Sequence, residues 1–346
     1  MNILILRLSS MGDIILTQPI CAVLQKHYPG CNIDYLCKEE FKELPEMFSP
    51  PVHSIIYQKK LKFHLRFWRK KYDIVIDLHS KFATYLIMLF MNSPVKVRYC
   101  KKRRYRKRIV KGDQKAKIFS TVDLYASALQ KMGINEQWHN PCLQINKSEL
   151  PNSALASGKA DVNTYNKSTN SARIVRQECQ DIKPIKIAIF PGANHFTKRY
   201  PVSCWIQLIN THPQYCFTLL GSNTDKEICD NIHKHCPGNC INLCSSFSFP
   251  ELYAELEGYN LIISGDTGPM HLAATLNKPQ IAIFGGTHPR LGFKPLNNAA
   301  LILCADLPCQ PCSLHGREKC PKGHFNCMNS ITPALIGAAI KKALSY

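Results

Sequence analysis

Apolar and polar positions along the chain alternate in a way that predicts strands and helices in turn. Residues 3–8 form a short apolar, β-branched run, residues 9–13 a polar turn, and residues 14–28 an apolar-periodic stretch. Residues 33–37 then complete a strand–helix–strand unit. The same order begins again at Ile185–Phe190. Two such units predict two Rossmann-like halves, each a parallel sheet covered by helices.

Each half continues with further elements of the same kind. We expect strands at 74–77, 95–99, 216–220, 260–264 and 280–284, and helices at 82–91, 121–132, 202–211, 269–276 and 333–344. Residues 151–182 are rich in Ser, Asn, Lys and Ala and lack periodicity, which is typical of a linker or insertion. The predicted organisation is an N-terminal domain at 1–150, that linker, a second domain at 183–330 and a C-terminal helix at 331–346.

Positive charge is concentrated in two segments. The chain carries 44 Lys and Arg against 24 Asp and Glu, a net charge of +20. Residues 96–117 hold twelve of the basic residues and one acid, and residues 59–71 hold seven and no acid. With 45% hydrophobic and 20% charged residues, the composition excludes a collagenous, fully disordered or mainly coiled-coil chain. Two local basic patches indicate an anionic partner.

The 17 cysteines would suit a secreted disulfide framework, but residues 1–7 do not resemble a signal peptide. They have no basic n-region, and their apolar run ends at Arg7. We therefore expect a reducing, cytoplasmic compartment in which most thiols act as small core hydrophobes. The longest apolar stretch, residues 85–91, is too short to span a bilayer, so any membrane contact is expected to be peripheral.

The first turn, residues 9–13 (SSMGD), lies where a strand ends and a helix begins. In folds of this kind ligands bind at the carboxyl edge of the sheet. A carboxylate at that edge could accept a proton from a substrate hydroxyl, as a general base does. Asp13 is therefore a candidate base, and the alternative is that it simply caps a helix starting at Ile14.

A second loop, residues 191–201 (PGANHFTKRYP), holds the same position after a strand. Lys198 and Arg199 could neutralise a diphosphate there, with the Thr197 hydroxyl and backbone amides completing the anion site. The alternative is an ordinary solvated loop with two charges.

The segment 264–274 (SGDTGPMHLAA) is a strand, a Gly-Asp-Thr-Gly turn and a helix. The Thr267 hydroxyl and the amides of Thr267 and Gly268 are expected to face a phosphate. His271 either contacts phosphate or sugar or is a core histidine. Another small-residue loop, residues 284–289 (FGGTHP), follows the next strand on the same edge.

With these motifs the chain resembles the bacterial ADP-heptose:lipopolysaccharide heptosyltransferases, glycosyltransferase family 9. The similarity covers nearly the whole length, through ILILRLSSMGDIILTQP, FPGANHFTKRYP, SGDTGPMHLAA, KPQIAIFGGTHP and a late cysteine segment. The resemblance implies an α/β GT-B fold, in which two Rossmann-like domains with parallel sheets face each other across a cleft. It also implies that the N-terminal domain holds the acceptor and the C-terminal domain the nucleotide sugar.

By the same resemblance, Asp13 matches the family's proposed general base and Lys198 the lysine that contacts the donor phosphates. The family's acidic ribose-binding position falls on residues 222–225, without a clear glutamate. The implied reaction is inverting transfer of a heptose from ADP-heptose to a lipopolysaccharide inner-core (lipid A-Kdo) acceptor, with no cofactor needed for catalysis. The residues that match the family's donor-binding segments are Thr197, Asp266, Thr267, Gly268 and His271.

Both basic segments lie in the proposed acceptor domain. Residues 59–71 interleave apolar and aromatic side chains with the charges, which suits an anionic membrane surface. We therefore expect a peripheral protein on the cytoplasmic face of the inner membrane. A solvated loop is the alternative for either segment. The candidates for contact with the phosphates and carboxylates of an inner core are Arg103, Arg104, Arg106, Lys107 and Arg108.

Four late cysteines, Cys309, Cys312, Cys320 and Cys327, follow the pattern C-x2-C-x7-C-x6-C, with histidines nearby. Clustered thiols in a reducing compartment permit a structural zinc site, and free or packed thiols are the alternative.

Two other functions are compatible with these patterns. One is a family 9 transferase that uses a different nucleotide sugar. The other is a nucleic-acid-binding protein that uses the Arg/Lys run and a cysteine-cluster metal site. The chain shows no recognition helix, RNP pattern or standard zinc finger, so a nucleic acid partner is not expected.

Overall fold

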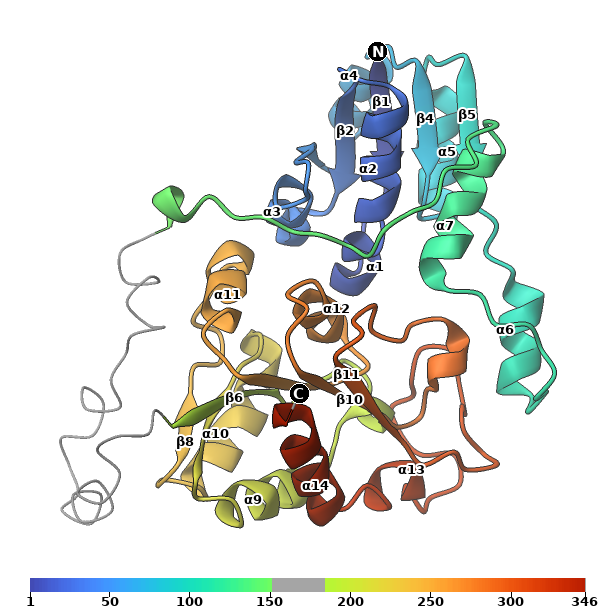
Figure 1. Cartoon of the computed structure of the whole chain (residues 1–346). Helices are drawn as coiled ribbons and strands as arrows, with labels where there is room; N and C mark the ends of the chain where they lie inside the picture. The colour runs from blue at the N-terminus through green and yellow to red at the C-terminus, as the bar shows by residue number, and fades with distance from the viewer. Residues whose placement is uncertain (151–183, 346) are drawn as a thin grey trace. The chain divides into compact units, whose positions relative to one another are not determined.

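The computed structural model of the chain describes residues 1–150 and 184–345 (Figure 1). The predicted linker at 151–182 lies outside these residues. The chain divides into a first unit, Met1–Gln144 with Pro289–Asn297, and a second unit, Ile145–His288 with Asn298–Tyr346. The sequence placed 289–297 in the second domain. These residues belong to the first unit because Arg290 hydrogen-bonds to Gln114 and the Gly292 carbonyl accepts from Thr121.

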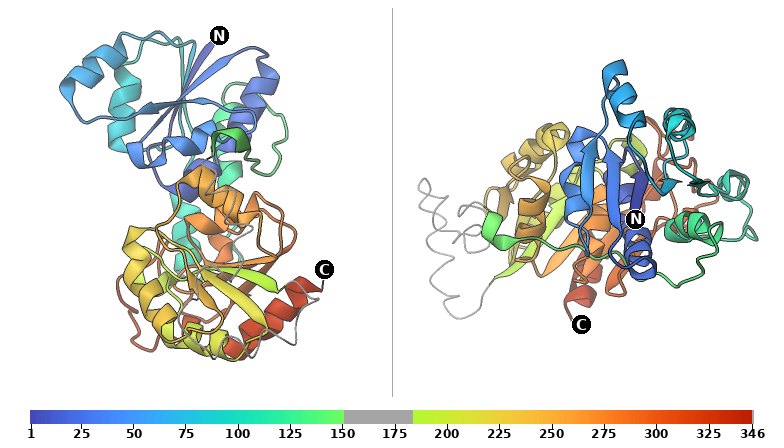
Figure 2. Two further views of the ribbon diagram at one scale, coloured as in Figure 1. Left: turned by 90° about the vertical axis from the view of Figure 1, so that its left-hand side faces the viewer. Right: turned by 90° about the horizontal axis from the view of Figure 1, so that it is seen from above.

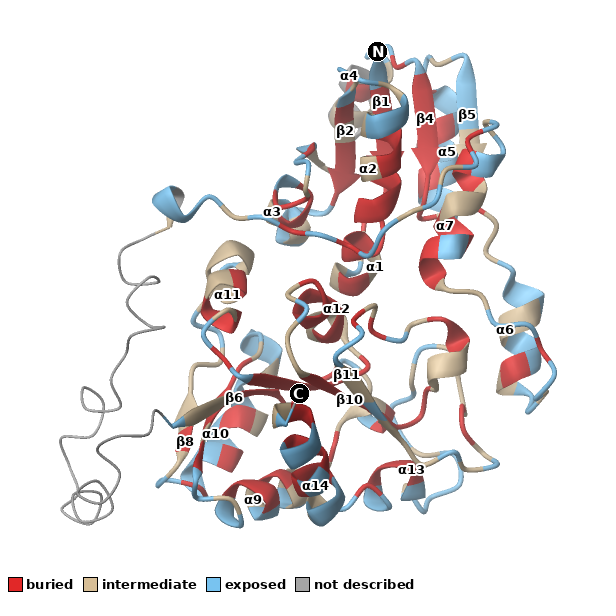
Figure 3. Cartoon of the chain, in the orientation of Figure 1, coloured by how far each residue is buried: buried red, intermediate tan, exposed pale blue. Residues whose placement is uncertain are grey.

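The first unit is built on a five-stranded, fully parallel sheet in the order β3-β2-β1-β4-β5. Its strands are β1 (Asn2–Leu6), β2 (Asn32–Cys37), β3 (His53–Ile56), β4 (Ile74–Asp77) and β5 (Val95–Arg98). Its helices are α1 (Met11–Ile15), α2 (Gln18–His27), α3 (Glu43–Glu46), α4 (Leu61–Trp68), α5 (Phe82–Phe90), α6 (Arg103–Val110) and α7 (Thr121–Gln130). Helices α4 and α5 cover one face, and α2 and α7 the other (Figure 2). Because both faces are covered, the central strands are almost wholly apolar and buried (Figure 3).

The second unit has a six-stranded parallel sheet in the order β11-β10-β9-β6-β7-β8. Its strands are β6 (Ile185–Phe190), β7 (Tyr215–Leu219), β8 (Cys240–Asn242), β9 (Leu261–Gly265), β10 (Gln280–Phe284) and β11 (Ala300–Cys304). Its helices are α9 (Val202–Asn210), α10 (Lys226–Lys234), α11 (Phe249–Leu256), α12 (Gly268–Ala274), α13 (Asn326–Asn329) and α14 (Pro333–Leu344). The main core joins α9, α10 and α14 to the sheet around the buried Trp205. Short 3₁₀ turns lie at η1 (Glu39–Phe41), η2 (Lys147–Glu149), η4 (Phe196–Lys198), η5 (Asn223–Asp225) and η6 (Pro289–Leu291).

The two predicted parallel-sheet halves are confirmed, but one predicted helix is wrong in detail. In place of one helix at 14–28, α1 begins at Met11 and a separate α2 begins at Gln18. Pro19 has no N–H to continue the ladder, and the Thr17 hydroxyl donates to the Ile14 carbonyl at 2.6 Å. The sequence also missed β3, β8 and β11. β3 and β8 are short and only partly buried, so they lack a long apolar run, whereas β11 (ALILC) is wholly apolar and was overlooked although its pattern indicates a strand.

Each sheet has one point at which the strand order reverses. The chain runs outward from β1 to β3 and then returns to place β4 beside β1. In the second unit it runs from β6 to β8 and returns to place β9 beside β6. Ligands of open parallel sheets bind outside the carboxyl ends of the strands at these reversal points. The candidate residues Asp13, Lys198 and Asp266 all follow these strands.

Two further expectations concern the membrane and the cysteines. Within residues 1–150 and 184–345, no helix is long and apolar enough to cross a bilayer. The 16 cysteines in these ranges are all free thiols, and several, such as Cys21 and Cys229, are fully buried.

Candidate active site

The carboxyl end of β1 carries a buried ion pair. The Arg7 guanidinium lies 2.5 Å from Asp13 Oδ2, and the side chains retain 8% and 22% of their exposure. Tyr125, from α7, donates its hydroxyl to Asp13 Oδ1 at 3.0 Å, and Ser10 donates to Oδ2 at 3.1 Å. Arg7 is itself held by the Leu78 carbonyl at 2.7 Å. The carboxylate is therefore fixed from three sides and still reaches solvent.

The charge balance around Asp13 keeps its carboxylate ionised. Burial alone raises the pKa of Asp13, but the Arg7 charge and the hydrogen bonds from Tyr125 and Ser10 outweigh it, so that the pKa lies below its ordinary value. Burial lowers the pKa of His79 to about 3, helped by the charges of Arg7 and nearby lysines, so this imidazole is neutral at neutral pH.

Asp13 is the third residue of α1 and accepts from Ser10 at the start of that helix. The alternative that it caps a helix starting at Ile14 is wrong, because the helix begins at Met11. Asp13 also contacts the buried Arg7 and the hydroxyl of Tyr125, which lies 112 positions away. Stabilising the end of α1 would require neither contact.

At the carboxyl ends of β6 and β9, a lysine and an aspartate meet. Lys198 Nζ donates to the Asp266 backbone carbonyl at 2.8 Å and lies 2.9 Å from Asp266 Oδ2. Thr287, in the loop after β10, donates its hydroxyl to the same oxygen at 2.7 Å. The Lys198 and Asp266 side chains retain 17% and 8% of their exposure. Three loops of one sheet edge thus meet at the Asp266 carboxylate, which holds the partly buried Lys198.

Thr197 is fully buried, and its hydroxyl, amide and carbonyl all form hydrogen bonds with other residues of the protein. Its hydroxyl accepts from the Arg317 amide at 2.8 Å, its amide donates to the Arg317 carbonyl at 3.0 Å, and its carbonyl accepts from the Gly286 amide at 2.7 Å. The hydroxyl therefore fastens the Lys198 loop to two neighbouring segments, rather than standing open to a ligand.

The contact between Gly286 and Thr197 leaves no room for a side chain. A Cβ at Gly286 would lie 2.6 Å from Thr197 Oγ1 and 2.7 Å from its Cβ. We expect Gly286→Ala to lower the free energy of unfolding by about 1–3 kcal/mol through overpacking, and to weaken donor binding by displacing Lys198. Urea denaturation and nucleotide calorimetry measure the two effects. Gly238→Ala is the matched control, since a Cβ there meets nothing within 4 Å; equal stability of the two variants would contradict the close contact.

The remaining donor candidates lie at the start of α12. Thr267 is the N-cap, but its amide donates to the Gly265 carbonyl at 2.9 Å, so the expectation that this amide faces a phosphate is wrong. Gly268 is the first residue of the helix. His271 is the fourth residue of α12 and is 5% exposed, and the structure leaves both interpretations of it open.

The loop after β7 supplies an acidic residue that the sequence did not single out. Asp225 accepts from the Ser222 amide at 2.9 Å and hydroxyl at 2.8 Å. A Cβ built on Gly192 would overlap Asp225 Oδ1, so this carboxylate lies directly against the loop after β6. Asp225 thus occupies the sheet edge at which the resemblance places a ribose-binding acid.

The basic segment at 96–117 contains helix α6, where a solvated loop was the alternative. Arg103, Arg104 and Lys107 are exposed. Arg106 instead donates to Thr121 at 3.0 Å and covers the Phe293 ring at 4.7 Å. Arg108 pairs with Asp113 at 2.7 Å. Four of the five predicted contact residues are therefore exposed, with Arg108 also paired to Asp113, and Arg106 is the one held against the protein.

The basic segment at 59–71 also forms a helix, α4, and its aromatic side chains turn inward. Phe67 is buried, and Phe63 and Trp68 pack against the same core cluster under the sheet. The expectation that these aromatic residues form a membrane-facing surface is wrong. Packing against the apolar face of the sheet removes these rings from water, so α4 places its aromatic side chains on that side.

The four late cysteines line one cavity of about 20 Å³, together with His324. Cys309 Sγ lies 3.9 Å from His324 Nε2.

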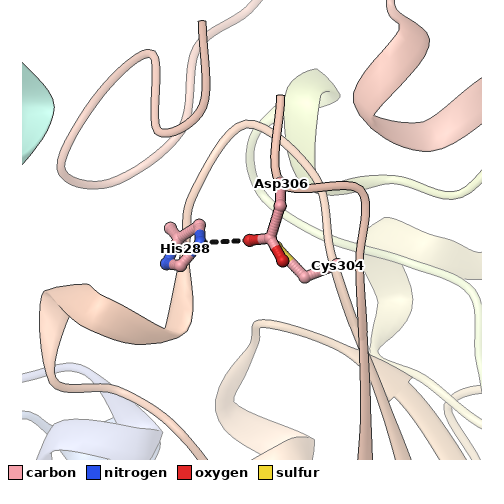
Figure 4. A group of neighbouring side chains, drawn as sticks. All are labelled: His288, Cys304 and Asp306. Carbon is pink, nitrogen blue, oxygen red and sulfur yellow. Dashed lines mark hydrogen bonds and ion pairs between the residues drawn. The ribbon is translucent and has the colours of Figure 1, made fainter. Parts of the chain in front are cut away.

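A second group of possible metal ligands lies elsewhere in the described ranges. The donor atoms of His288, Cys304 and Asp306 all lie within 4.8 Å of one another (Figure 4). Its contact is a 2.7 Å hydrogen bond between His288 and the exposed Asp306. Burial raises the pKa of the Cys304 thiol to about 12.

Sequence reasoning missed Arg7, Tyr125 and Thr287. Arg7 carries a usable signal, because an arginine that ends a buried apolar strand needs a partner nearby. Thr287 lies in the loop 284–289 that the sequence indicated, but its contact with Asp266 was not predicted, and Tyr125 carries no signal because it reaches Asp13 only through the fold.

Two fully parallel α/β units, with charged groups where their strand order reverses, define the two-domain GT-B class of glycosyltransferases. The chain belongs to glycosyltransferase family 9 (heptosyltransferase), whose family model matches residues 60–322. It is 24% identical to lipooligosaccharide heptosyltransferase 2 of Haemophilus influenzae over 88% of each chain.

Among solved structures it is similar to a family 9 glycosyl transferase of Veillonella parvula, with a TM-score of 0.74 and 18% identity over 99% of this chain and 97% of that one. It is also similar to the Escherichia coli ADP-heptose lipopolysaccharide heptosyltransferase II, with a TM-score of 0.72 and 20% identity over 99% and 98%. The resemblance noted in the sequence is confirmed, and the nucleic-acid alternative is not supported.

Proposed function

We propose that this enzyme transfers a heptose, with inversion, from ADP-heptose to a lipopolysaccharide inner-core acceptor. Its family and the names of its relatives support the substrate class. The observation that carries the chemistry is the pair of charged groups at the two strand-order reversals. One is a fixed carboxylate, Asp13, and the other a partly buried cation, Lys198.

In this proposal Asp13 is the general base. The acceptor hydroxyl attacks the anomeric carbon of the heptose, and its proton passes to the carboxylate as the new C–O bond forms. The bond from the anomeric carbon to the diphosphate breaks, and ADP leaves with the electron pair. Because Arg7 and Tyr125 hold the pKa of Asp13 low, the carboxylate is ionised at neutral pH but is a weak base. It therefore takes the proton late, when the attacking oxygen has become acidic.

Lys198 stabilises the leaving diphosphate. Two of its contacts go to Asp266, which holds the ammonium in a fixed position before the donor binds. A fixed cation stabilises charge that develops as the leaving group departs, without reorganisation during the step. Gly268, Thr267 and His271 complete the proposed donor site, and Asp225 is the proposed acceptor of a ribose hydroxyl. No cofactor is required by this mechanism.

The acceptor side is proposed to recognise phosphate and carboxylate groups. Lys101 contributes a cation, although burial and the charges of Arg103 and Arg7 lower its pKa to about 8. Arg103, Arg104 and Lys107 extend the positive charge along α6. Since the inner core is attached to a lipid, the enzyme is proposed to act as a peripheral protein on the cytoplasmic face of the inner membrane.

The test of the donor is a binding panel. Calorimetry at moderate salt with ADP, UDP, GDP, ADP-heptose and ADP-glucose is expected to show selective binding of ADP and ADP-heptose. Transfer is then followed with a lipid A-Kdo acceptor in detergent. Preference for another nucleotide would replace ADP-heptose by a different nucleotide sugar within the same family, and binding of none would refute the transferase proposal.

We also infer that the four late cysteines hold a structural metal ion. Four thiol groups and one imidazole line a single small cavity, and four of these five groups would supply the ligands of a tetrahedral zinc ion, although their donor atoms do not form a group within 4.8 Å of one another. The same loop is tied to the donor site, since the Cys312 amide donates to Gly286 and Arg317 bonds to Thr197. The ion would hold this loop in place and take no part in the transfer.

Elemental analysis of purified protein is expected to find one zinc ion per chain. Replacement of Cys320 by Ser is expected to remove most of it, to lower the melting temperature and to weaken ADP binding. Cys142→Ser, at an exposed cysteine outside the cavity, is the matched control. Protein free of zinc and iron, with unchanged stability in Cys320→Ser, would contradict the site.

A further inference from the structure

Helix α5 exposes an unusual amount of apolar surface. Its inner residues Ile87 and Met88 pack in the core cluster beneath the sheet. Its outer face is also apolar, with five large side chains that retain 37–75% of their exposure: Phe82, Tyr85, Leu86, Leu89 and Phe90. A helix that is apolar on both faces is normally buried on both, which indicates that this face has an occupant.

Cations flank this surface on both sides. Phe90 contacts the Trp68 ring at 4.7 Å, which joins α5 to the end of α4, where Arg69, Lys70 and Lys71 are exposed. On the other side, exposed Lys96 donates to the Leu89 carbonyl at 3.1 Å. The Arg98 guanidinium lies over the Tyr85 ring at 5.0 Å.

Acidic residues are few around the helix: the exposed Asp73 accepts from the Asn2 amide at 2.7 Å, and Asp34 pairs with Lys70 at 3.6 Å. Between Asp77 and Asp113 the sequence contains no Asp or Glu, and Asp77 is fully buried and paired with Arg98 at 2.9 Å. Residues 59–71 are free of acids as well. An apolar strip with positive margins is complementary to a bilayer that has an acyl interior and anionic headgroups. The same charge opposes pairing with a second copy, because two such surfaces would repel each other.

We propose that α5 is the membrane-docking element of this protein, and that its occupant is an anionic phospholipid bilayer. The helix lies in the plane of the interface, with Phe82, Leu89 and Phe90 inserted at the boundary between headgroups and acyl chains. The lysines and arginines beside it contact lipid phosphates. The proposal rests on the proposed function for the identity of the membrane. It places the contact on α5, whereas the sequence placed it on the aromatic residues of 59–71.

Vesicle sedimentation tests the surface directly. The probes are vesicles of phosphatidylcholine alone and of phosphatidylcholine with an equal part of phosphatidylglycerol. Wild type is expected to bind the anionic vesicles, and Leu89→Ser to bind them at least about tenfold more weakly. Leu335→Ser is the matched control, because Leu335 is a helical leucine of similar exposure, 46% against 52%, in the other unit. Thermal unfolding and ADP calorimetry show that both variants are folded.

The outcomes separate this proposal from the proposed function. Equal vesicle binding by Leu89→Ser and Leu335→Ser, or no binding by wild type, overturns the docking surface even where transfer to a detergent-dispersed acceptor proceeds. Binding that depends on α5 supports it even where no nucleotide sugar is used. If wild type self-associates in gel filtration, Leu89→Ser abolishes that association and no vesicles bind, α5 is an interface between copies and the proposal is wrong.

Discussion

Replacement of Asp13 by Asn is expected to reduce the transfer rate about a thousandfold, while ADP affinity stays within about twofold of wild type. The amide keeps the size of the carboxylate but cannot accept the acceptor's proton. The donor groups Lys198 and Asp266 belong to the other unit and are unchanged. Single-turnover transfer from ADP-heptose measures the rate, and calorimetry measures the affinity. A variant that retains a tenth or more of the wild-type rate would rule out Asp13 as the base.

The pH profile distinguishes a catalytic from a structural role for this group. The folded-state pKa of Asp13 lies below its ordinary value, so its base form is present at neutral pH and is lost only as the pH falls through that lowered pKa. Wild-type activity should show no loss from this group between about pH 5 and 8. Tyr125→Phe removes one hydrogen bond to Oδ1 and keeps the ring against Tyr99. It should move the acid limb of the profile upward; an unmoved limb would show that Tyr125 acts on packing alone.

Replacement of Lys198 by Ala is the second large effect and is expected to abolish measurable donor binding. It also leaves the Asp266 carboxylate buried without its cation, with the Thr287 hydroxyl still donating to it at 2.7 Å. Loss of one partner of a buried ion pair lowers the free energy of unfolding by about 3–5 kcal/mol, and this variant should be correspondingly unstable.

A double variant separates the two effects of Lys198. Lys198→Ala with Asp266→Asn removes the uncompensated charge and should recover most of the stability in urea denaturation. Donor binding should remain absent, because the cation that faces the diphosphate is still missing. Recovery of ADP binding together with stability would mean that Lys198 only neutralises Asp266 and does not contact the donor.

The part of the fold that rests on local pattern could be predicted from the sequence. Apolar β-branched runs followed by glycine-containing turns and amphipathic stretches indicated β1, β6, β9 and β10 and the helices after them. The pattern was weaker at β3 and β8, where burial is partial. Edge strand β11 was not found, and the break at Thr17 was missed because it depends on a side chain that competes for a backbone carbonyl.

The sequence by itself determined the two parallel-sheet halves, the family, and which loops carry Asp13, Lys198 and Asp266, because these follow from short-range periodicity and motif spacing. Only the tertiary structure decided what those residues touch. Asp13 meets Tyr125 across 112 positions, and Lys198 meets Asp266 across 68, because β9 pairs beside β6 and α7 packs near β1. It also decided that the aromatic residues of α4 point inward while α5 keeps an apolar outer face. Periodicity shows that a helix has apolar positions, but the neighbours that cover each face are set by packing between segments far apart in the chain.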